Sequence, residues 1–106
     1  DGDIDKMRRD YDMRRRFTVD AFRKIGLDCF EPEGAFYLFP CIKSTGLSSE
    51  EFCEKLVMSK RVAVIPGNAF GDCGEGFIRV SYCYSIDNIK EAVRRIGEFI
   101  KELGEN

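Results

Sequence analysis

The sequence predicts an α/β fold of the α+β type, a two-layer sandwich in which helices cover one face of a small mixed or antiparallel sheet. Three observations lead to this prediction. A long helical pattern stands at each end of the 106-residue chain. Short runs rich in β-branched and aromatic residues lie between them, and a capped helix divides these runs into two pairs. The expected order is therefore α-β-β-α-β-β-α in a single domain, residues 1–106.

The first helix is expected over residues 4–25, because apolar side chains recur there at helical spacing and Gly26 follows as a stop signal. Arginine and aspartate are interleaved along its middle, which favours a solvated helix face over an anion-binding patch. Two strands are expected next, over residues 27–30 and 35–39, joined by a turn at residues 32–34. The second strand is apolar on both faces, so we expect cover on both sides, one of them from outside this chain.

The sharpest local signal is a capping box, with Ser48 as the N-cap of a middle helix and Glu51 as its partner three residues on. This helix is expected to end near Lys60, before a strand over residues 62–65 that Pro66 stops. Four glycines follow between residues 67 and 76. A phosphate-binding loop would lead into a helix, whereas these glycines lead into a strand, so we expect a tight connection between two strands.

The strand within GEGFIRVSY, residues 74–82, places an arginine among aromatic and β-branched residues. Because side chains alternate along a strand, Ile78 and Val80 share the face expected to enter the core, and Arg79 points to the other face. That second face also carries an aromatic and a hydroxyl side chain, a mixture that suits contact with an anion. The same pattern also fits an arginine at a sheet edge that is solvated or pairs with Glu75.

The last helix is expected to begin after an N-cap at Ser85 and to run to Gly104. Its apolar side chains recur every three or four residues over barely three heptads. A face that lies on the sheet is therefore favoured over a coiled-coil seam.

Composition excludes several classes of function. Seventeen basic and nineteen acidic residues leave a net charge of −2, so neither nucleic acid nor a membrane is an expected partner. Histidine is absent, which removes Ser-His and Cys-His nucleophile pairs and histidine metal sites, and we expect no metal site. The five cysteines form no C-x-x-C pair, which favours reduced thiols. No signal peptide or initiator methionine opens the chain, so we expect a piece of a longer cytoplasmic protein.

Four stretches have to be considered together: PEGAFYLFP (residues 32–40), STGLSSEEF (44–52), VAVIPGNAFG (62–71) and GEGFIRVSYCYS (74–85). In this order and at these separations they closely resemble the C-terminal small domain of class I pyridoxal-phosphate-dependent aminotransferases of the aspartate and aromatic type. The resemblance covers nearly the whole chain. It implies the small-domain fold of fold-type I enzymes, with the helix over residues 4–25 bridging to a large domain outside this chain.

The resemblance also answers why an arginine stands in the strand. In that family the arginine of the I-R-x-S-Y strand binds the substrate α-carboxylate, and this role falls on Arg79. A guanidinium suits the task because its planar, two-pronged donor matches a planar carboxylate. The lysine that bonds pyridoxal phosphate belongs to the large domain, and Ser59-Lys60 lacks the family's continuation, so Lys60 is expected to be a solvated charge at a helix end.

The resemblance thus implies an enzyme, a transaminase that exchanges an amino group between an amino acid and a 2-oxo acid as a homodimer. Its pyridoxal phosphate is expected in the parent enzyme only, and the isolated chain, with no catalytic and no cofactor-binding residue, is expected to be inactive. Two alternatives stay open. One is a related enzyme of the same fold type, such as a carbon–sulfur lyase or a cyclopropane-forming synthase, and the other is a non-enzymatic amino-acid-sensing or dimerisation module.

Overall fold

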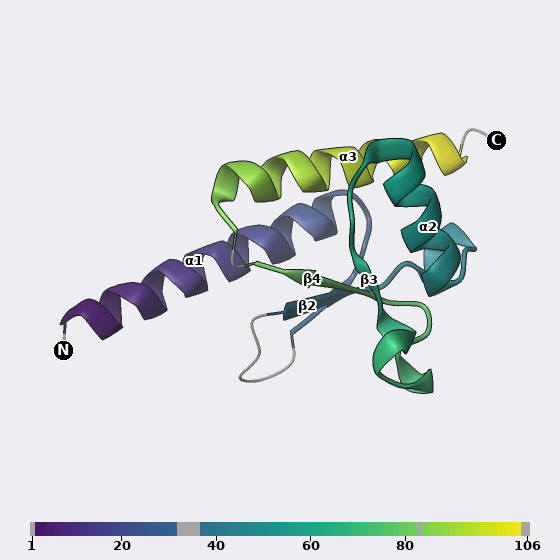
Figure 1. Cartoon of the computed structure of the whole chain (residues 1–106). Coiled ribbons are helices and arrows are strands. Elements are labelled where there is room, and N and C mark those ends of the chain that lie inside the picture. Colours follow the sequence, from purple (N-terminus) through teal and green to yellow (C-terminus); the bar gives the residue numbers. More distant parts are fainter. Residues whose placement is uncertain (1, 32–36, 83, 105–106) are drawn as a thin grey trace.

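The computed structural model describes residues 2–31, 37–82 and 84–104 (Figure 1). Its α-helices and strands are α1 (Gly2–Lys24), β1 (Cys29–Phe30), β2 (Tyr37–Pro40), α2 (Ser49–Lys60), β3 (Ile65–Pro66), β4 (Ile78–Ser81) and α3 (Ile86–Gly104). Short 3₁₀ helices, which the sequence did not predict, lie at Lys43–Thr45, Gly67–Phe70 and Asp72–Gly74. None of the helices in these ranges is long and apolar enough to cross a membrane.

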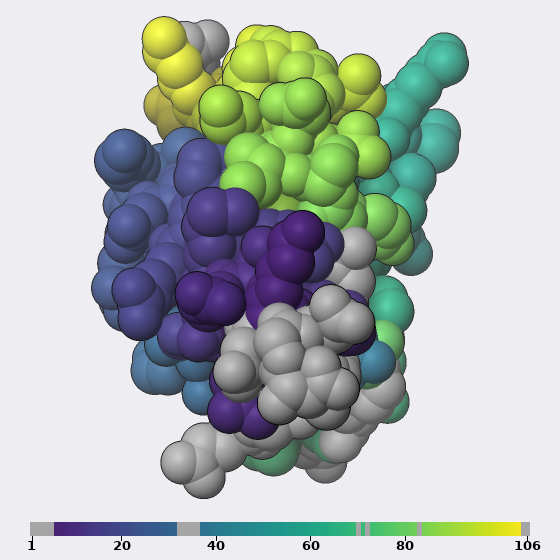
Figure 2. All heavy atoms as spheres, turned by 90° about the vertical axis from the view of Figure 1, so that its left-hand side faces the viewer, coloured from purple at the N-terminus to yellow at the C-terminus, as the bar shows by residue number. Residues whose placement is uncertain are grey.

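The strands form one antiparallel sheet in the order β1-β2-β4-β3. This confirms the predicted α+β class and decides between a mixed and an antiparallel sheet in favour of the second. The helices gather on one side of the sheet, with α1 and α3 running beside each other and α2 next to β3 (Figures 1 and 2). The N-terminal half of α1 extends away from the sheet (Figure 1).

The hydrophobic core lies between the helices and the inner face of the sheet. Leu38 and Ile78 contribute fully buried side chains from the two central strands, and Phe22 and Phe52 do so from α1 and α2. Phe99 of α3 meets Phe52 edge to face, with 5.2 Å between the ring centroids. The apolar stripe of the last helix is confirmed as a core face, and Phe99, which lies beside that stripe, joins it.

The first helix was predicted correctly in kind but slightly wrongly in extent, whereas the last helix spans Ile86–Gly104 as predicted. The first helix begins at Gly2 rather than at residue 4 and ends at Lys24. Gly26 terminates it with φ of 91°, a left-handed conformation that glycine adopts without a steric cost. The amide of Leu27 then donates to the carbonyl of Phe22 at 3.0 Å, so the chain turns back toward the sheet.

The predicted capping box of α2 is present in full. The amide of Glu51 donates to Ser48 Oγ at 3.2 Å, and the amide of Ser48 donates to Glu51 Oε1 at 3.2 Å. Hydrogen bonding of the Glu51 carboxylate by the Ser48 amide, and secondarily by the Ser48 side chain, lowers the pKa of Glu51. The start of the helix is marked by this local pair of hydrogen bonds, which explains why the sequence located it to the residue.

Two strands are shorter than predicted. The first spans only Cys29–Phe30 of the expected 27–30, and β3 spans Ile65–Pro66 where residues 62–65 were expected. Residues 62–64 lie outside the strand, because β3 pairs with β4 only through Ile65 with Arg79 and Pro66 with Ile78. Pro66 takes part in the pairing because β3 is an edge strand. The turn at residues 32–34 and the start of the strand over residues 35–39 lie outside the described residues.

The glycine-rich segment joins β3 to β4, as predicted. Two of its glycines are needed for a close approach of the backbone. A Cβ atom at Gly67 would lie 2.3 Å from the carbonyl oxygen of Gly74, and the amide of Gly67 donates to the carbonyl of Phe77 at 2.8 Å. The glycines therefore serve the packing of this connection.

The thiols of the described residues are expected to differ sharply in reactivity. Burial raises the pKa of Cys29 to about 12 and that of Cys53 to about 11, whereas Cys73 is exposed. Because the thiolate is the reactive form, a maleimide at pH 8 should modify Cys73 first and reach Cys29 and Cys53 only after urea is added. Mass spectrometry of timed samples checks this order, with Cys73→Ser as the control. Rapid modification of Cys29 or Cys53 in the folded chain would contradict the packing described here.

Candidate functional site

Arg79 lies in a row of side chains that crosses the sheet on the face turned away from the helices. The register pairs Phe30 with Phe39 and Ile65 with Arg79, and the pairing of β2 with β4 sets Phe39 opposite Arg79. Directly opposed residues of antiparallel strands share one face. Arg79 is therefore flanked across the sheet by an aromatic and a β-branched side chain.

We call this face of the sheet the outer face. Its described members are Phe30, Tyr37, Phe39, Cys41, Ile65, Phe77, Arg79 and Ser81. Several of them are exposed although they are large and apolar, whereas Leu38 and Ile78, which alternate with them, are fully buried and Val80 is partly buried against the core. The alternation predicted for the Arg79 strand is confirmed: one face is core, and the other mixes aromatic, guanidinium and hydroxyl groups at the surface.

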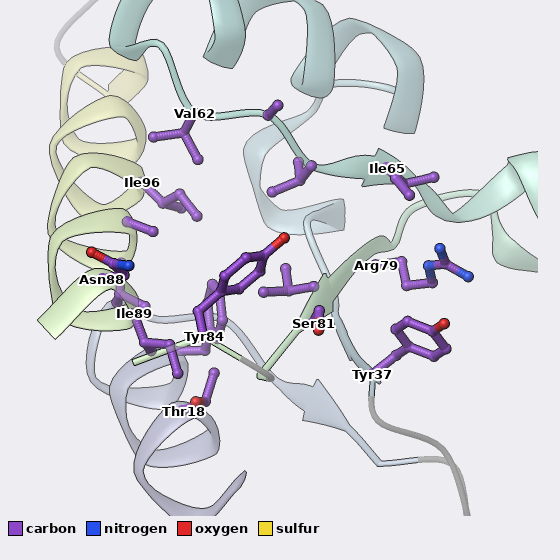
Figure 3. Close-up of a pocket in the computed structure, with 16 residues that line it drawn as sticks. Thr18, Tyr37, Val62, Ile65, Arg79, Ser81, Tyr84, Asn88, Ile89 and Ile96 are labelled. Carbon is purple, nitrogen blue, oxygen red and sulfur yellow. The ribbon is translucent and has the colours of Figure 1, made fainter. Parts of the chain in front are cut away.

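The guanidinium of Arg79 is stacked on an aromatic ring. Its Cζ atom lies 4.1 Å from the centroid of the Tyr37 ring, and Figure 3 shows the two side chains next to each other. Arg79 is half-buried, and 37% of Tyr37 is exposed. Glu75, the partner considered from the sequence, accepts a hydrogen bond from the amide of Ser49 at 3.0 Å. The carboxylate of Glu75 is thus engaged at the start of α2.

Tyr37 is the residue of this site that the sequence analysis missed. It lies inside the PEGAFYLFP stretch. Its neighbour across the sheet depends on how the adjacent strand is aligned with this stretch, and the sequence of the stretch does not determine that alignment. The observed register pairs Tyr37 with Ser81, so its ring is diagonal to Arg79 on the same face. Diagonal neighbours in a sheet are close enough for aromatic and long side chains to touch.

Arg79 and Tyr37 lie at the edge of a cavity of about 390 Å³ (Figure 3). The cavity occupies the space where residues 62–64 diverge from β4. Its wall is largely apolar and includes Val62, Ile89 and Ile96, and Tyr84 projects toward the stretch from Val62 to Ile65 (Figure 3). The cavity thus brings β3, β4 and α3 together beside the arginine.

Lys60 is not the solvated charge that the sequence predicted. Its Nζ lies 2.6 Å from Glu102 Oε1 and 3.6 Å from Glu98 Oε2 of α3, and only 16% of its side chain is exposed. The hydrogen bond to Glu102 raises the pKa of Lys60, which holds the amine in its protonated form. The sequence could not indicate this pair because its partners lie far along the chain.

Lys60 is not placed to bond pyridoxal phosphate. A lysine that bonds a carbonyl carbon has to lose its proton, and Lys60 is held protonated at the junction of α2 and α3. Within residues 2–31, 37–82 and 84–104, no group of three or more cysteine, aspartate and glutamate residues is arranged to hold a metal ion. What the geometry offers is a positioned guanidinium on an apolar surface.

Comparison with known proteins gives one consistent family. The model of the aminotransferase class I and II family matches residues 1–96. A putative aminotransferase of Bacillus subtilis, YugH, is 49% identical over 98 residues, which are 92% of this chain and 25% of the relative. The aspartate aminotransferase of Pyrococcus abyssi is 43% identical over 99 residues, 93% of this chain and 25% of that protein.

The fold matches the same kind of protein. The crystal structure of an aromatic aminotransferase from Pyrococcus horikoshii superposes with a TM-score of 0.89 at 42% identity, covering 95% of this chain and 27% of that one. The chain thus spans about a quarter of the length of the relatives that it matches. Sequence and fold agree, and the chain belongs to the class I and II aminotransferase family.

Proposed function

We propose that this chain is the C-terminal small domain of a pyridoxal-phosphate-dependent aminotransferase, and that Arg79 binds the α-carboxylate of its amino-acid and 2-oxo-acid substrates. The relatives named as aspartate and aromatic aminotransferases support a donor of one of these two kinds. The observation that carries the proposal is the placement of Arg79, half-buried at the centre of a sheet face whose other members are mostly apolar.

The surroundings of Arg79 favour binding of a carboxylate. Phe39 and Ile65 on either side lower the local dielectric, which strengthens the attraction between opposite charges. A guanidinium donates two parallel hydrogen bonds to a carboxylate, so it fixes the orientation of the substrate as well as its position. Arg79 would therefore bind and orient the substrate, and proton transfer would fall to groups outside this chain.

The exposed outer face supports the existence of a neighbouring domain. Aromatic and β-branched side chains such as Phe30 and Ile65 are exposed there, and α1 extends away from the sheet (Figure 1). We infer that α1 leads to a large domain that covers the outer face and holds pyridoxal phosphate, with the parent enzyme a homodimer. The cofactor supplies the electron sink for the reaction, and this domain supplies a fixed carboxylate anchor.

The proposed activity can be tested on the full-length protein that contains this chain, loaded with pyridoxal phosphate. With aspartate or phenylalanine as the donor and 2-oxoglutarate as the acceptor, we expect glutamate to form in step with the 2-oxo acid of the donor. A carbon–sulfur lyase would instead cleave a cysteine conjugate with water to a thiol, ammonia and pyruvate, and it would need no 2-oxo acid as amino-group acceptor. Release of ammonia without glutamate formation would contradict the proposed transaminase.

A further inference from the structure

We propose that Tyr37 is a positioning residue for Arg79: its ring holds the guanidinium in the orientation that receives the substrate carboxylate. This inference rests on the proposed function of Arg79 and extends it to a residue of the neighbouring strand. The contact that carries it is the 4.1 Å separation between Arg79 Cζ and the centroid of the Tyr37 ring. Cation–π contacts are effective within about 6 Å, so this pair is well inside the range.

The guanidinium carbon of Arg79 lies over the ring of Tyr37. A ring against the flat face of a guanidinium directs the N–H groups parallel to the ring rather than into it. The register sets the two residues diagonally on the outer face, since Tyr37 pairs with Ser81 and Arg79 pairs with Ile65. Figure 3 shows the ring of Tyr37 beside the guanidinium and away from the centre of the cavity.

The stack also explains how a flexible side chain can act as a precise anchor. An arginine that is free to rotate loses its rotamer freedom each time a substrate binds, whereas one already stacked loses it when the domain folds. Such preorganisation strengthens binding of the substrate and of the transition state by the same amount. Loss of the ring should therefore raise KM and leave kcat unchanged.

The test compares Tyr37→Leu with Tyr37→Phe in the full-length holoenzyme. Leucine removes the ring face, so KM for the amino acid should rise by roughly 5- to 30-fold, with kcat within about 3-fold of the wild type. Phenylalanine keeps the ring, so its KM should stay within about 3-fold of the wild type. Tyr84→Leu is the matched control, because it makes the same change at an exposed residue on another part of the cavity wall.

Two further measurements separate positioning from simple packing. In an Arg79→Ala background, Tyr37→Leu should change KM by less than about 3-fold, because the ring acts through the arginine. For an amine without a carboxylate, Tyr37→Leu should leave KM unchanged in the otherwise wild-type enzyme.

The inference is overturned if Tyr37→Leu leaves KM for the amino acid unchanged, or if it raises KM equally for the carboxylate-free amine. A rise in KM with Tyr37→Phe as large as that with Tyr37→Leu would also overturn it, because the ring face would then be irrelevant. If Arg79→Ala alone leaves the kinetics unchanged, the proposed role of Arg79 fails and the inference fails with it. Failure of the inference alone is recognised by a strong effect of Arg79→Ala combined with none of Tyr37→Leu.

Discussion

In the full-length enzyme, Arg79→Ala is expected to lower kcat/KM for the amino-acid donor by about 30- to 5,000-fold. The substitution removes one partner of a charge pair that becomes buried when substrate binds, and such a loss costs about 2–5 kcal/mol. Each 1.36 kcal/mol of lost transition-state stabilisation lowers the rate about tenfold, which gives the expected range. Steady-state kinetics with saturating 2-oxo acid measures this ratio.

Arg79→Lys separates charge from geometry in the same assay. Lysine keeps the positive charge but loses the two-pronged donor, so its kcat/KM should lie between those of the wild type and Arg79→Ala. Thermal unfolding of both variants checks that the fold is intact. Equal kcat/KM values for the three proteins would show that no carboxylate is bound at this position.

The largest expected effect on stability comes from the contact between α2 and α3. Phe52 is fully buried and its ring meets Phe99 edge to face. Phe52→Ala should lower the free energy of unfolding by about 3–5 kcal/mol, because it leaves a cavity that the surrounding core fills only in part. Urea titration of the chain, followed by far-ultraviolet circular dichroism, measures the change.

Met58→Ala is the matched control for this prediction, since Met58 is on the same helix and is 84% exposed. It should change the free energy of unfolding by less than about 0.5 kcal/mol. If Phe52→Ala and Met58→Ala shift the urea midpoint equally, the packing of α2 against α3 described here is wrong.

Sequence reasoning succeeded where the deciding interactions are local. The start of α2 follows from Ser48 and Glu51, three residues apart, and both members of the capping box are present. The two faces of β4 follow from the alternation of side chains, which the backbone imposes on any strand. The placement of Arg79 on the outer face could therefore be predicted before the fold was known.

Sequence reasoning failed where distant segments decide. The length of β3 is set by how many of its residues pair with β4, and only Ile65 and Pro66 do so. Lys60 forms an ion pair with Glu102 across the interface between α2 and α3. The periodicity of side chains along either helix does not reveal this pair. The stack of Tyr37 on Arg79 depends on the register between β2 and β4. These contacts are properties of the tertiary fold.

The central claim is that Arg79 binds the substrate by its carboxylate, and a carboxylate-free amine tests it most directly. The measurement is kcat/KM for an amino acid and for the matching amine, each with the wild-type enzyme and with Arg79→Ala. The amine should be a poor substrate for the wild type and should lose little further with the variant, while the amino acid loses most of its advantage. If the amine and the amino acid lose activity equally, Arg79 supports the fold and does not bind the carboxylate.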